Sequence, residues 1–167
     1  ARREIRAEDH SYDRARWKEL AQLGFLALAA DETQGGMGGS LVDLAVIAEA
    51  FGQGNAVDPW LENAALPIRL LSKAGIGDAL EPYLDGSKIA AFAFAEPRRR
   101  YNLKPSLTSA KAAEDGFTLS GEKNFVMGGA LADSFIVTAD LDGETALFLI
   151  PAYGEGVHHR SYRIADG

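Results

Sequence analysis

The sequence contains no cysteine, which excludes disulfide bridges, a thiolate nucleophile and a zinc site built from cysteine. It also lacks the basic surplus needed to bind nucleic acid or an anionic membrane, because its net charge is −7. No apolar run is long enough to cross a bilayer, and no signal peptide is visible. The lack of cysteine also fits a reducing compartment, and we expect a cytoplasmic protein.

The chain is long enough for one ordinary domain or two small ones, with 167 residues of which 47% are hydrophobic. Up to about residue 86, apolar residues recur with the period of a helix, and after residue 88 they alternate as they do in strands. This change predicts an α+β fold, in which a helical bundle segment precedes an antiparallel, barrel-like β domain. We expect the helical domain to occupy residues 1–87 and the β domain to occupy residues 88–167.

The helical part contains recognisable start and stop signals. Ser40 with Asp43 three residues later is close to a capping box, in which two side chains satisfy donors at the helix start. Asp58 is predicted to cap a helix whose first residue is Pro59, and Pro67 should kink or split that helix. The predicted helices are Ser11–Leu23, one from Ser40 to Gly52, one from Asp58 to Gly75, and a short one capped by Asp78 and Glu81 that ends near Gly86.

The β part begins with a short apolar run in which Phe92 and Phe94 alternate with small residues. Glu96-Pro97 should end this strand, since proline cannot donate a backbone hydrogen bond. Two Asp-Gly pairs are typical hairpin turns. The predicted strands are Ile89–Ala95, Leu107–Ala113 and Phe117–Val126 around Asp115-Gly116, Ser134–Leu141 and Thr145–Ile150 around Asp142-Gly143, and His158–Arg163.

Several clusters have both a structural and a functional interpretation. Gly35–Gly39 precedes a helix and could hold a phosphate, but it follows no strand of a βαβ unit, so we favour a tight turn. Adjacent His158 and His159 would point to opposite faces of a strand, which favours packing over a metal site. The cationic cluster of Arg98–Arg100 with Lys104 could pair with pyrophosphate or coenzyme A phosphates, or form a solvated loop or subunit contact.

The phenylalanines and glutamates of the β part and the helices are most simply interpreted as structural. Phenylalanines in such a sheet most often form its core, and the candidates are Phe92, Phe94, Phe117, Phe125 and Phe135. The candidate catalytic carboxylates are Glu32, Glu49, Glu96 and Glu122. Nothing in their spacing marks a catalytic pair. We expect a structural role for Glu96.

One long segment and several flanking motifs resemble the acyl-CoA dehydrogenase family. The segment Ala90–Val126 reads AAFAFAEPRRRYNLKPSLTSAKAAEDGFTLSGEKNFV, and the part from Glu96 to Lys123 follows the family pattern without a gap. The flanking motifs that fit the same family are Leu23-Gly24-Phe25, Glu32-Thr33-Gln34-Gly35-Gly36-Met37-Gly38-Gly39, Gly156-Val157 and Tyr162-Arg163-Ile164-Ala165-Asp166-Gly167. Together they cover nearly the whole chain and resemble a divergent bacterial member.

The resemblance implies α,β-desaturation of an acyl-CoA thioester with hydride transfer to FAD, in fatty acid or steroid side-chain metabolism. It also implies a homo- or heterotetramer, with an electron-transferring flavoprotein as a candidate acceptor. The catalytic base of this family lies in a C-terminal helical domain, which we expect outside these 167 residues. No catalytic residue and no metal ligand is therefore assigned to this chain.

The resemblance also assigns ligand-facing positions. The residues expected along the flavin are Phe94, Ala95, Phe125 and Met127, with Tyr101 near the phosphates of flavin and coenzyme A. Arg98, Arg100 and Tyr101 are expected to bind the coenzyme A part of the substrate. Ala95 and Met127 stand where the family usually has hydroxyl residues, and Arg98–Tyr101 replaces a run of small residues.

Two alternatives stay open. Divergent bacterial members of the family show similar departures, and some of them form the flavin-poor half of a two-subunit enzyme, so the chain could be a structural partner subunit. The chain could also belong to a non-desaturating flavin enzyme of the same fold, such as a flavin-dependent monooxygenase or nitroalkane oxidase.

Overall fold

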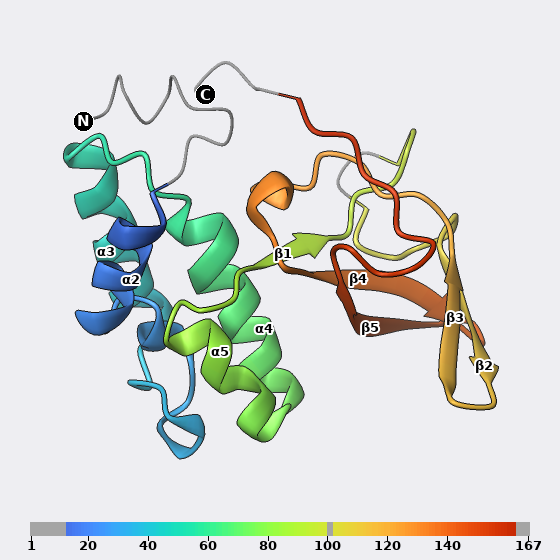
Figure 1. The fold of residues 1–167 in the computed structure, drawn as a ribbon, viewed down its shortest axis with the longest axis horizontal. Coiled ribbons are helices and arrows are strands. Elements are labelled where there is room, and N and C mark those ends of the chain that lie inside the picture. The colour runs from blue at the N-terminus through green and yellow to red at the C-terminus, as the bar shows by residue number, and fades with distance from the viewer. Residues whose placement is uncertain (1–12, 100–101, 163–167) are drawn as a thin grey trace.

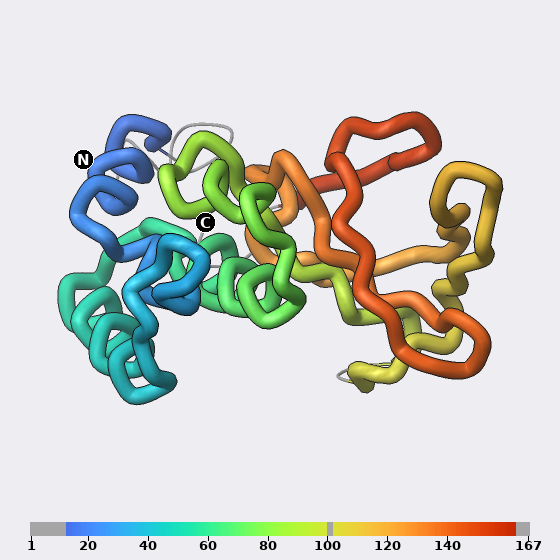
Figure 2. Tube along the Cα trace, turned by 90° about the horizontal axis from the view of Figure 1, so that it is seen from below, coloured from blue at the N-terminus to red at the C-terminus, as the bar shows by residue number. Residues whose placement is uncertain are grey.

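A computed structural model of the chain describes residues 13–99 and 102–162. Helices occupy the first half of this range and strands the second half, and the two parts lie side by side in both views (Figure 1; Figure 2). The helical elements are α2 (Arg14–Gln22), η1 (Ala27–Ala29), η2 (Glu32–Gln34), α3 (Leu41–Gln53), η3 (Leu61–Ala65), α4 (Leu66–Ala74), η4 (Gly77–Leu80) and α5 (Glu81–Leu84). The predicted change from helices to strands is therefore confirmed for the described residues.

Of the three predicted helix caps, one is present in the structure and two are not. The Ser40 hydroxyl accepts the Asp43 backbone N–H at 3.3 Å and the Asp43 carboxylate accepts the Ser40 backbone N–H at 2.8 Å, so the capping box is confirmed. The prediction that Asp58 caps a helix is wrong, because its carboxylate accepts from the Arg16 guanidinium at 2.7 Å. The prediction for Asp78 is also wrong, since it lies inside the 3₁₀ turn η4, which has no side-chain cap.

The helix that contains Pro67 is divided, as predicted. The five residues of η3 form a π-helical turn, in which the Leu66 backbone N–H donates to the Leu61 carbonyl. The regular helix α4 then starts at Leu66 and has Pro67 in its first turn, where the missing N–H of proline is tolerated.

Buried apolar side chains of the helices and the first strand residues form one shared core. Trp17 and Trp60 are each 1% exposed, and the Trp60 indole N–H donates to the Phe25 carbonyl at 2.9 Å. Ile89 and Ile136 from the β part pack into the same core. Helix α3 contributes little to this core, since Leu44 is its only buried residue and Leu41 is 68% exposed.

The described strands form one open, mixed sheet. They are β1 (Ala90–Ala93), β2 (Ser109–Ala113), β3 (Gly116–Ser120), β4 (Ser134–Leu141) and β5 (Glu144–Pro151). The β2–β3 and β4–β5 pairs are antiparallel, as predicted, whereas β1 and β2 both pair with β4 in parallel. The order β1-β4-β2-β3, with β5 on the other edge of β4, leaves the sheet open, so it is barrel-like only in a loose sense.

Both predicted hairpins are present, and one turn is displaced. Asp142 and Gly143, with φ of 54° and 90°, connect β4 to β5 as predicted. In the other hairpin Ala113 pairs with Gly116, so the turn consists of residues 114–115, one residue earlier than predicted. The strand predicted for residues 158–163 is wrong over residues 158–162, which contain no strand, and residue 163 lies outside the described residues. Among the described helices, none has the length and apolar character that crossing a membrane requires.

Candidate functional site

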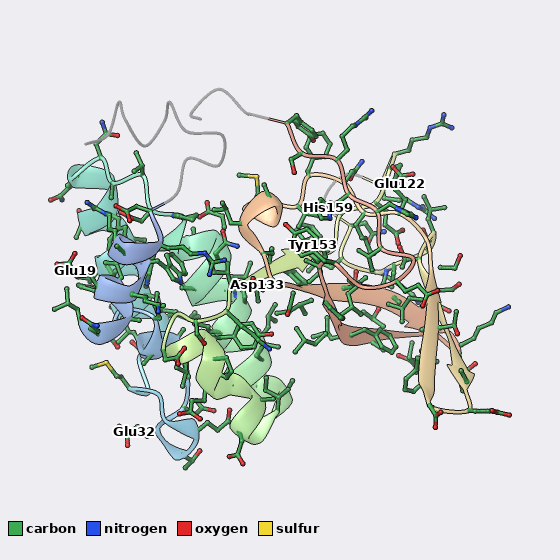
Figure 3. The ribbon with its side chains drawn as sticks, viewed as in Figure 1. Glu19, Glu32, Glu122, Asp133, Tyr153 and His159 are labelled. Carbon is green, nitrogen blue, oxygen red and sulfur yellow. The ribbon has the colours of Figure 1, made fainter. Side chains whose placement is uncertain are left out.

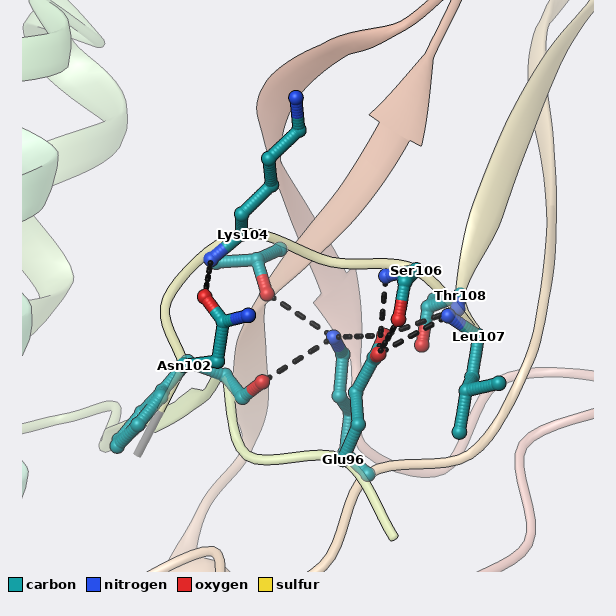
Figure 4. A network of polar contacts seen from close by, with 9 residues as sticks. Glu96, Asn102, Lys104, Ser106, Leu107 and Thr108 are labelled. Atoms are coloured by element: carbon teal, nitrogen blue, oxygen red, sulfur yellow. Dashed lines mark hydrogen bonds and ion pairs between the residues drawn. The ribbon is translucent and has the colours of Figure 1, made fainter. Parts of the chain in front are cut away.

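The centre of the candidate site is a buried carboxylate at the end of the first strand. Glu96 is 2% exposed, and its carboxylate accepts the backbone N–H groups of Ser106, Leu107 and Thr108, each at 2.9 Å (Figure 4). The Lys123 ammonium donates to the same carboxylate at 3.0 Å. The loop after β1 is thus wrapped around Glu96, which confirms the structural role predicted for this residue.

The charges of this pair are shifted in ways that follow from their surroundings. Burial alone would raise the pKa of Glu96, but the backbone N–H donors and the Lys123 ammonium outweigh it and lower the pKa to about 2. Burial lowers the pKa of Lys123 more than the neighbouring carboxylate raises it. A carboxylate that is ionised and fully occupied by donors is a poor catalytic base, so we assign Glu96 to holding the backbone.

Lys123 extends the network from the loop to the sheet. Its ammonium also donates to the Phe94 carbonyl at 3.3 Å and to the Thr138 hydroxyl of β4 at 2.9 Å. Three acceptors, two from the strip that contains Phe94 and Glu96 and one from β4, therefore surround one largely buried cation. This fixes the strip from Phe94 to Glu96 against β4.

Beside this strip lies the loop from Asn124 to Gly129. The Asn124 backbone N–H donates to the Ala95 carbonyl at 2.9 Å, which places the start of the loop next to Ala95. Phe125 has a φ of 51°, in the left-handed region that residues with a side chain rarely adopt. The Phe125 and Met127 side chains are 68% and 45% exposed. The loop therefore presents an aromatic and a thioether side chain to the surface.

The same loop presents unused backbone donors. Within the described residues, the backbone N–H groups of Phe125, Val126 and Met127 donate to no acceptor. Phe125 and Met127 are exposed, so water can accept from these donors, and a ligand with acceptor atoms can take the place of that water. An exposed aromatic ring next to such donors suits a flat heterocycle with acceptor atoms on its edge, such as an isoalloxazine. The residues present therefore fit a flavin, with backbone donors in place of the absent hydroxyl groups at Ala95 and Met127.

A cationic hollow borders the site. It is open, has a volume of about 930 Å³, and is lined by Pro97, Arg98, Arg99, Leu107, Ser120, Gly121 and Glu122. Neither Arg98 nor Arg99 forms an ion pair within the described residues. Two guanidinium groups against the one carboxylate of Glu122 leave a local positive surplus on a chain with net charge −7. Arg100 and Tyr101, which were predicted to act with Arg98, lie outside the described residues.

The predicted ligand-facing residues are placed as follows. Ala95 is buried, and Phe94 is half-buried with its ring stacked on Phe92 at 5.2 Å between centroids. The hydrogen bond from Asn124 brings Ala95 and the Phe125 loop together. The core interpretation holds for Phe135 and is wrong for Phe117 and Phe125, which are 51% and 68% exposed.

The glycine-rich segment and the two histidines keep their structural interpretation. The backbone N–H groups of residues 36–39 all donate to carbonyls of residues 27–31, so they are not available to a phosphate. His159 lies edge-on against Tyr153 at 5.2 Å and Phe135 at 6.0 Å between centroids, and Figure 3 shows Tyr153 and His159 together over the sheet. Among the described residues, no group of acidic or histidine side chains could hold a metal ion.

One residue that the sequence did not single out contacts the site. Asn63, in the π-helical turn η3, donates from its side-chain amide to the carbonyl of Gly128, at the end of the loop. The sequence signal that could have identified Asn63 is its position as a lone amide in the apolar run before Pro67. Nothing in that run indicates which loop the Asn63 side chain contacts.

Comparison with known proteins gives two consistent family matches. Residues 1–75 match the model described as "Acyl-CoA dehydrogenase, N-terminal domain", and residues 91–167 match "Acyl-CoA dehydrogenase, middle domain". Together these two matches span most of the chain.

Individual relatives agree with these matches. The chain is 28% identical to acyl-CoA dehydrogenase FadE27 of Mycobacterium tuberculosis, over 93% of this chain and 41% of that protein. It is 29% identical to benzylmalonyl-CoA dehydrogenase of Aromatoleum aromaticum, over 84% of this chain and 39% of that protein. The chain thus spans about two fifths of the length of these curated relatives.

Solved structures share the fold. The ChsE4–ChsE5 complex of Mycobacterium tuberculosis matches with a TM-score of 0.79 and 26% identity, over 92% of this chain and 42% of that chain. An acyl-CoA dehydrogenase of Bacillus anthracis complexed with FAD matches with a TM-score of 0.74 and 26% identity, over 97% of this chain and 29% of that chain. A variant of the steroid ACAD Tcur3481–Tcur3483 has a TM-score of 0.82 and 28% identity, over 93% of this chain and 43% of that chain.

Proposed function

Because the chain belongs to the acyl-CoA dehydrogenase family, we propose that the whole protein is an FAD-dependent enzyme that introduces an α,β double bond into an acyl-CoA thioester. The observation that carries this proposal is the loop Phe125–Met127, whose unpaired backbone donors and exposed side chains lie beside the buried Ala95 strip. The FAD complex of the Bacillus anthracis relative supports the choice of cofactor. We also propose a cytoplasmic location.

In this proposal the loop holds the flavin ring. The backbone N–H groups of Phe125, Val126 and Met127 donate to acceptor atoms at the ring edge, and the Phe125 ring covers part of its surface. Bound FAD supplies the acceptor for the hydride that leaves the β-carbon of the thioester. The Glu96–Lys123 pair keeps the Ala95 strip, and through it the loop, in a fixed place.

The hydroxyl groups absent at Ala95 and Met127 should weaken flavin binding. A neutral hydrogen bond contributes roughly 0.5–1.5 kcal/mol, so two of them correspond to about one to two orders of magnitude in affinity. The double substitution Met127→Thr with Ala95→Thr tests this in the intact protein, by FAD titration. We expect tighter binding than in the wild type and in the apolar control Met127→Leu, and unchanged affinity would mean that these positions do not face the ring.

We further propose that the cationic hollow receives the phosphate groups of coenzyme A. Guanidinium groups stay charged and present paired N–H donors that match phosphate oxygens. Arg98 and Arg99 line the hollow, and we expect Arg100 and Tyr101 to contribute from the same loop. Replacing Arg98 and Arg99 by alanine should raise KM for an acyl-CoA but not for the pantetheine thioester, which lacks these phosphates. Lys111→Ala, a charge removed from exposed strand β2, should change neither value.

The main test of the proposal is the visible spectrum of the purified intact protein. Oxidised flavin absorption that disappears when acyl-CoA is added anaerobically would support the enzyme. A colourless protein that also fails to bind added FAD would overturn it.

A second function is favoured by the absent hydroxyl groups. The chain could belong to the flavin-poor subunit of a two-component dehydrogenase, since two of the matched structures are named as pairs of different proteins, ChsE4–ChsE5 and Tcur3481–Tcur3483. A homo- or heterotetramer fits either function, and an electron-transferring flavoprotein is the proposed acceptor for the enzyme. Because the assembly fits either function, the flavin content per chain, measured on the purified assembly with and without a co-expressed partner, distinguishes the two.

A further inference from the structure

The helical part reaches the flavin-facing loop through one buried amide. Asn63 is 2% exposed and lies in the π-helical turn η3. Its side-chain NH₂ group donates to the Ala90 carbonyl of β1 at 2.9 Å and to the Gly128 carbonyl at 3.2 Å. One side chain thus links a helix, the first strand and the end of the loop.

The orientation of this amide follows from its partners. Both neighbours are carbonyl oxygens, so only the NH₂ end of Asn63 can face them. The opposite end, Oδ1, is buried without a partner among the described residues. A buried unpaired acceptor is unfavourable, and π-helical turns frequently occur at functional sites. The buried amide is unfavourable as a mere filler of the core, and its two hydrogen bonds to different segments give it a specific role in holding them.

Gly128 and Asn63 fit together closely. Gly128 has a φ of +64°, and a Cβ atom built on it would lie 1.8 Å from Oδ1 of Asn63. The other end of the loop is held by the hydrogen bond from Asn124 to Ala95. Between these two attachments Phe125 keeps its left-handed φ of 51°. Such a conformation persists only where the surroundings determine it, and here the two attachments do so.

We propose that Asn63 is a positioning residue for the flavin: it fixes the direction of the backbone N–H groups of Phe125, Val126 and Met127. The proposal rests on the proposed function for the identity of the ligand, and on the hydrogen bonds above for the geometry. Without the Gly128 attachment, the peptide groups of the loop turn toward other conformations, and the donors no longer converge on one ligand edge.

The test uses Asn63→Ala and Asn63→Leu in the intact protein, with Ser72→Ala as the matched control. Ser72 is also 2% exposed, lies in the neighbouring helix α4, and accepts the Asp31 backbone N–H at 3.0 Å with its hydroxyl. Its loss removes a buried hydrogen bond without touching the loop. The two readouts are the FAD dissociation constant and hydrogen exchange of the amides of Asn124, Gly129 and Leu131, which are bonded at the two ends of the loop.

We expect both Asn63 variants to weaken FAD binding by about tenfold or more and to speed exchange of these amides by a similar factor, since each loses the attachment. Ser72→Ala should leave both values near those of the wild type. If Asn63→Ala does not fold, Asn63→Leu, which fills the space, carries the test.

The outcomes separate this inference from the proposed function. Unchanged exchange at the loop, or exchange that rises equally in Ser72→Ala, overturns the role of Asn63. Faster exchange with unchanged FAD affinity also overturns it, because the loop then moves without consequence for the flavin. A wild-type protein that binds no FAD overturns the proposed function, and faster loop exchange in the Asn63 variants would then still support the attachment itself.

Discussion

Replacing Glu96 by glutamine is the sharpest test of how the site is held. The substitution keeps the shape of the side chain but removes its charge and puts an NH₂ group among five donors, which are three backbone N–H groups, the Ser106 hydroxyl and the Lys123 ammonium. At least one donor then loses its acceptor. Removing one partner of a buried charge pair is strongly destabilising.

The magnitude follows from the pKa of the carboxyl group. Its ordinary value is 4.5 and its value in the folded chain is about 2, a difference equivalent to about 3 kcal/mol of stability at neutral pH. Because the folded-state pKa is the lower one, this stabilisation is fully present above pH 4.5 and is lost as the pH falls toward 2. By about pH 3, roughly 2 kcal/mol of it should have disappeared.

Urea denaturation of the wild type and of Glu96→Gln, at several pH values from neutral to acidic, measures this difference. The variant should be less stable by about 3 kcal/mol at neutral pH, and the gap should narrow by about 2 kcal/mol at about pH 3. Glu114→Gln, an exposed glutamate in the β2–β3 turn, controls for the change in net charge. A gap that is the same at every pH would refute the linkage, and a gap below about 1 kcal/mol would refute the account of the network.

Further substitutions address other parts of the fold. Lys123→Met should destabilise by about 3 to 5 kcal/mol by leaving Glu96 unpaired, and the double variant with Glu96→Gln should lose less than the sum of the two, as a thermodynamic cycle would show. Gly128→Ala should destabilise by about 3 kcal/mol in thermal melts, because of its left-handed backbone and the contact with Asn63. Gly143→Ala, also left-handed but with open space around it, should lose only about 1 kcal/mol. Ser40→Ala should lose about 1 kcal/mol through its capping box, and no change in the melting temperature would contradict that role.

Local chemistry explains what could be predicted of the fold. Two short apolar runs on either side of an Asp-Gly turn specify β4, β5 and their connection, since these signals act over a few residues. Burial alternates along β5, whereas residues 134–139 of β4 are all buried. The parallel pairing of β1 with β4 was missed, because alternation indicates the faces of a strand and says nothing about its neighbours. The cap predicted at Asp58 failed for a similar reason, since Arg16, 42 residues away in the chain, takes the carboxylate. The division of the chain into residues 1–87 and 88–167 stays a prediction.

The candidate site was foreseen to a smaller extent. The motif around Glu96 indicated a structural carboxylate, and the network confirms it. The exposure of Phe125 contradicts the core interpretation, because strand β3 ends at Ser120 instead of continuing to Val126, and Phe125 lies in the loop that follows with a left-handed backbone. Asn63 was missed because a π-helical turn changes which residues of a helix share a face, and the apolar run around it conceals this.

The placement of the tryptophans determines what an optical experiment on this protein reports. The chain has two, Trp17 and Trp60, and both are buried in the core of the helical part. Intrinsic fluorescence therefore follows the loosening of the helices and gives little signal from the sheet, where the large aromatic residues are phenylalanine and tyrosine. If emission and far-ultraviolet circular dichroism give different midpoints for one variant, the sheet and the helices unfold in separate steps. Substitutions at the Glu96 network, which holds the sheet, should therefore change the emission midpoint only if the sheet and the helices unfold together.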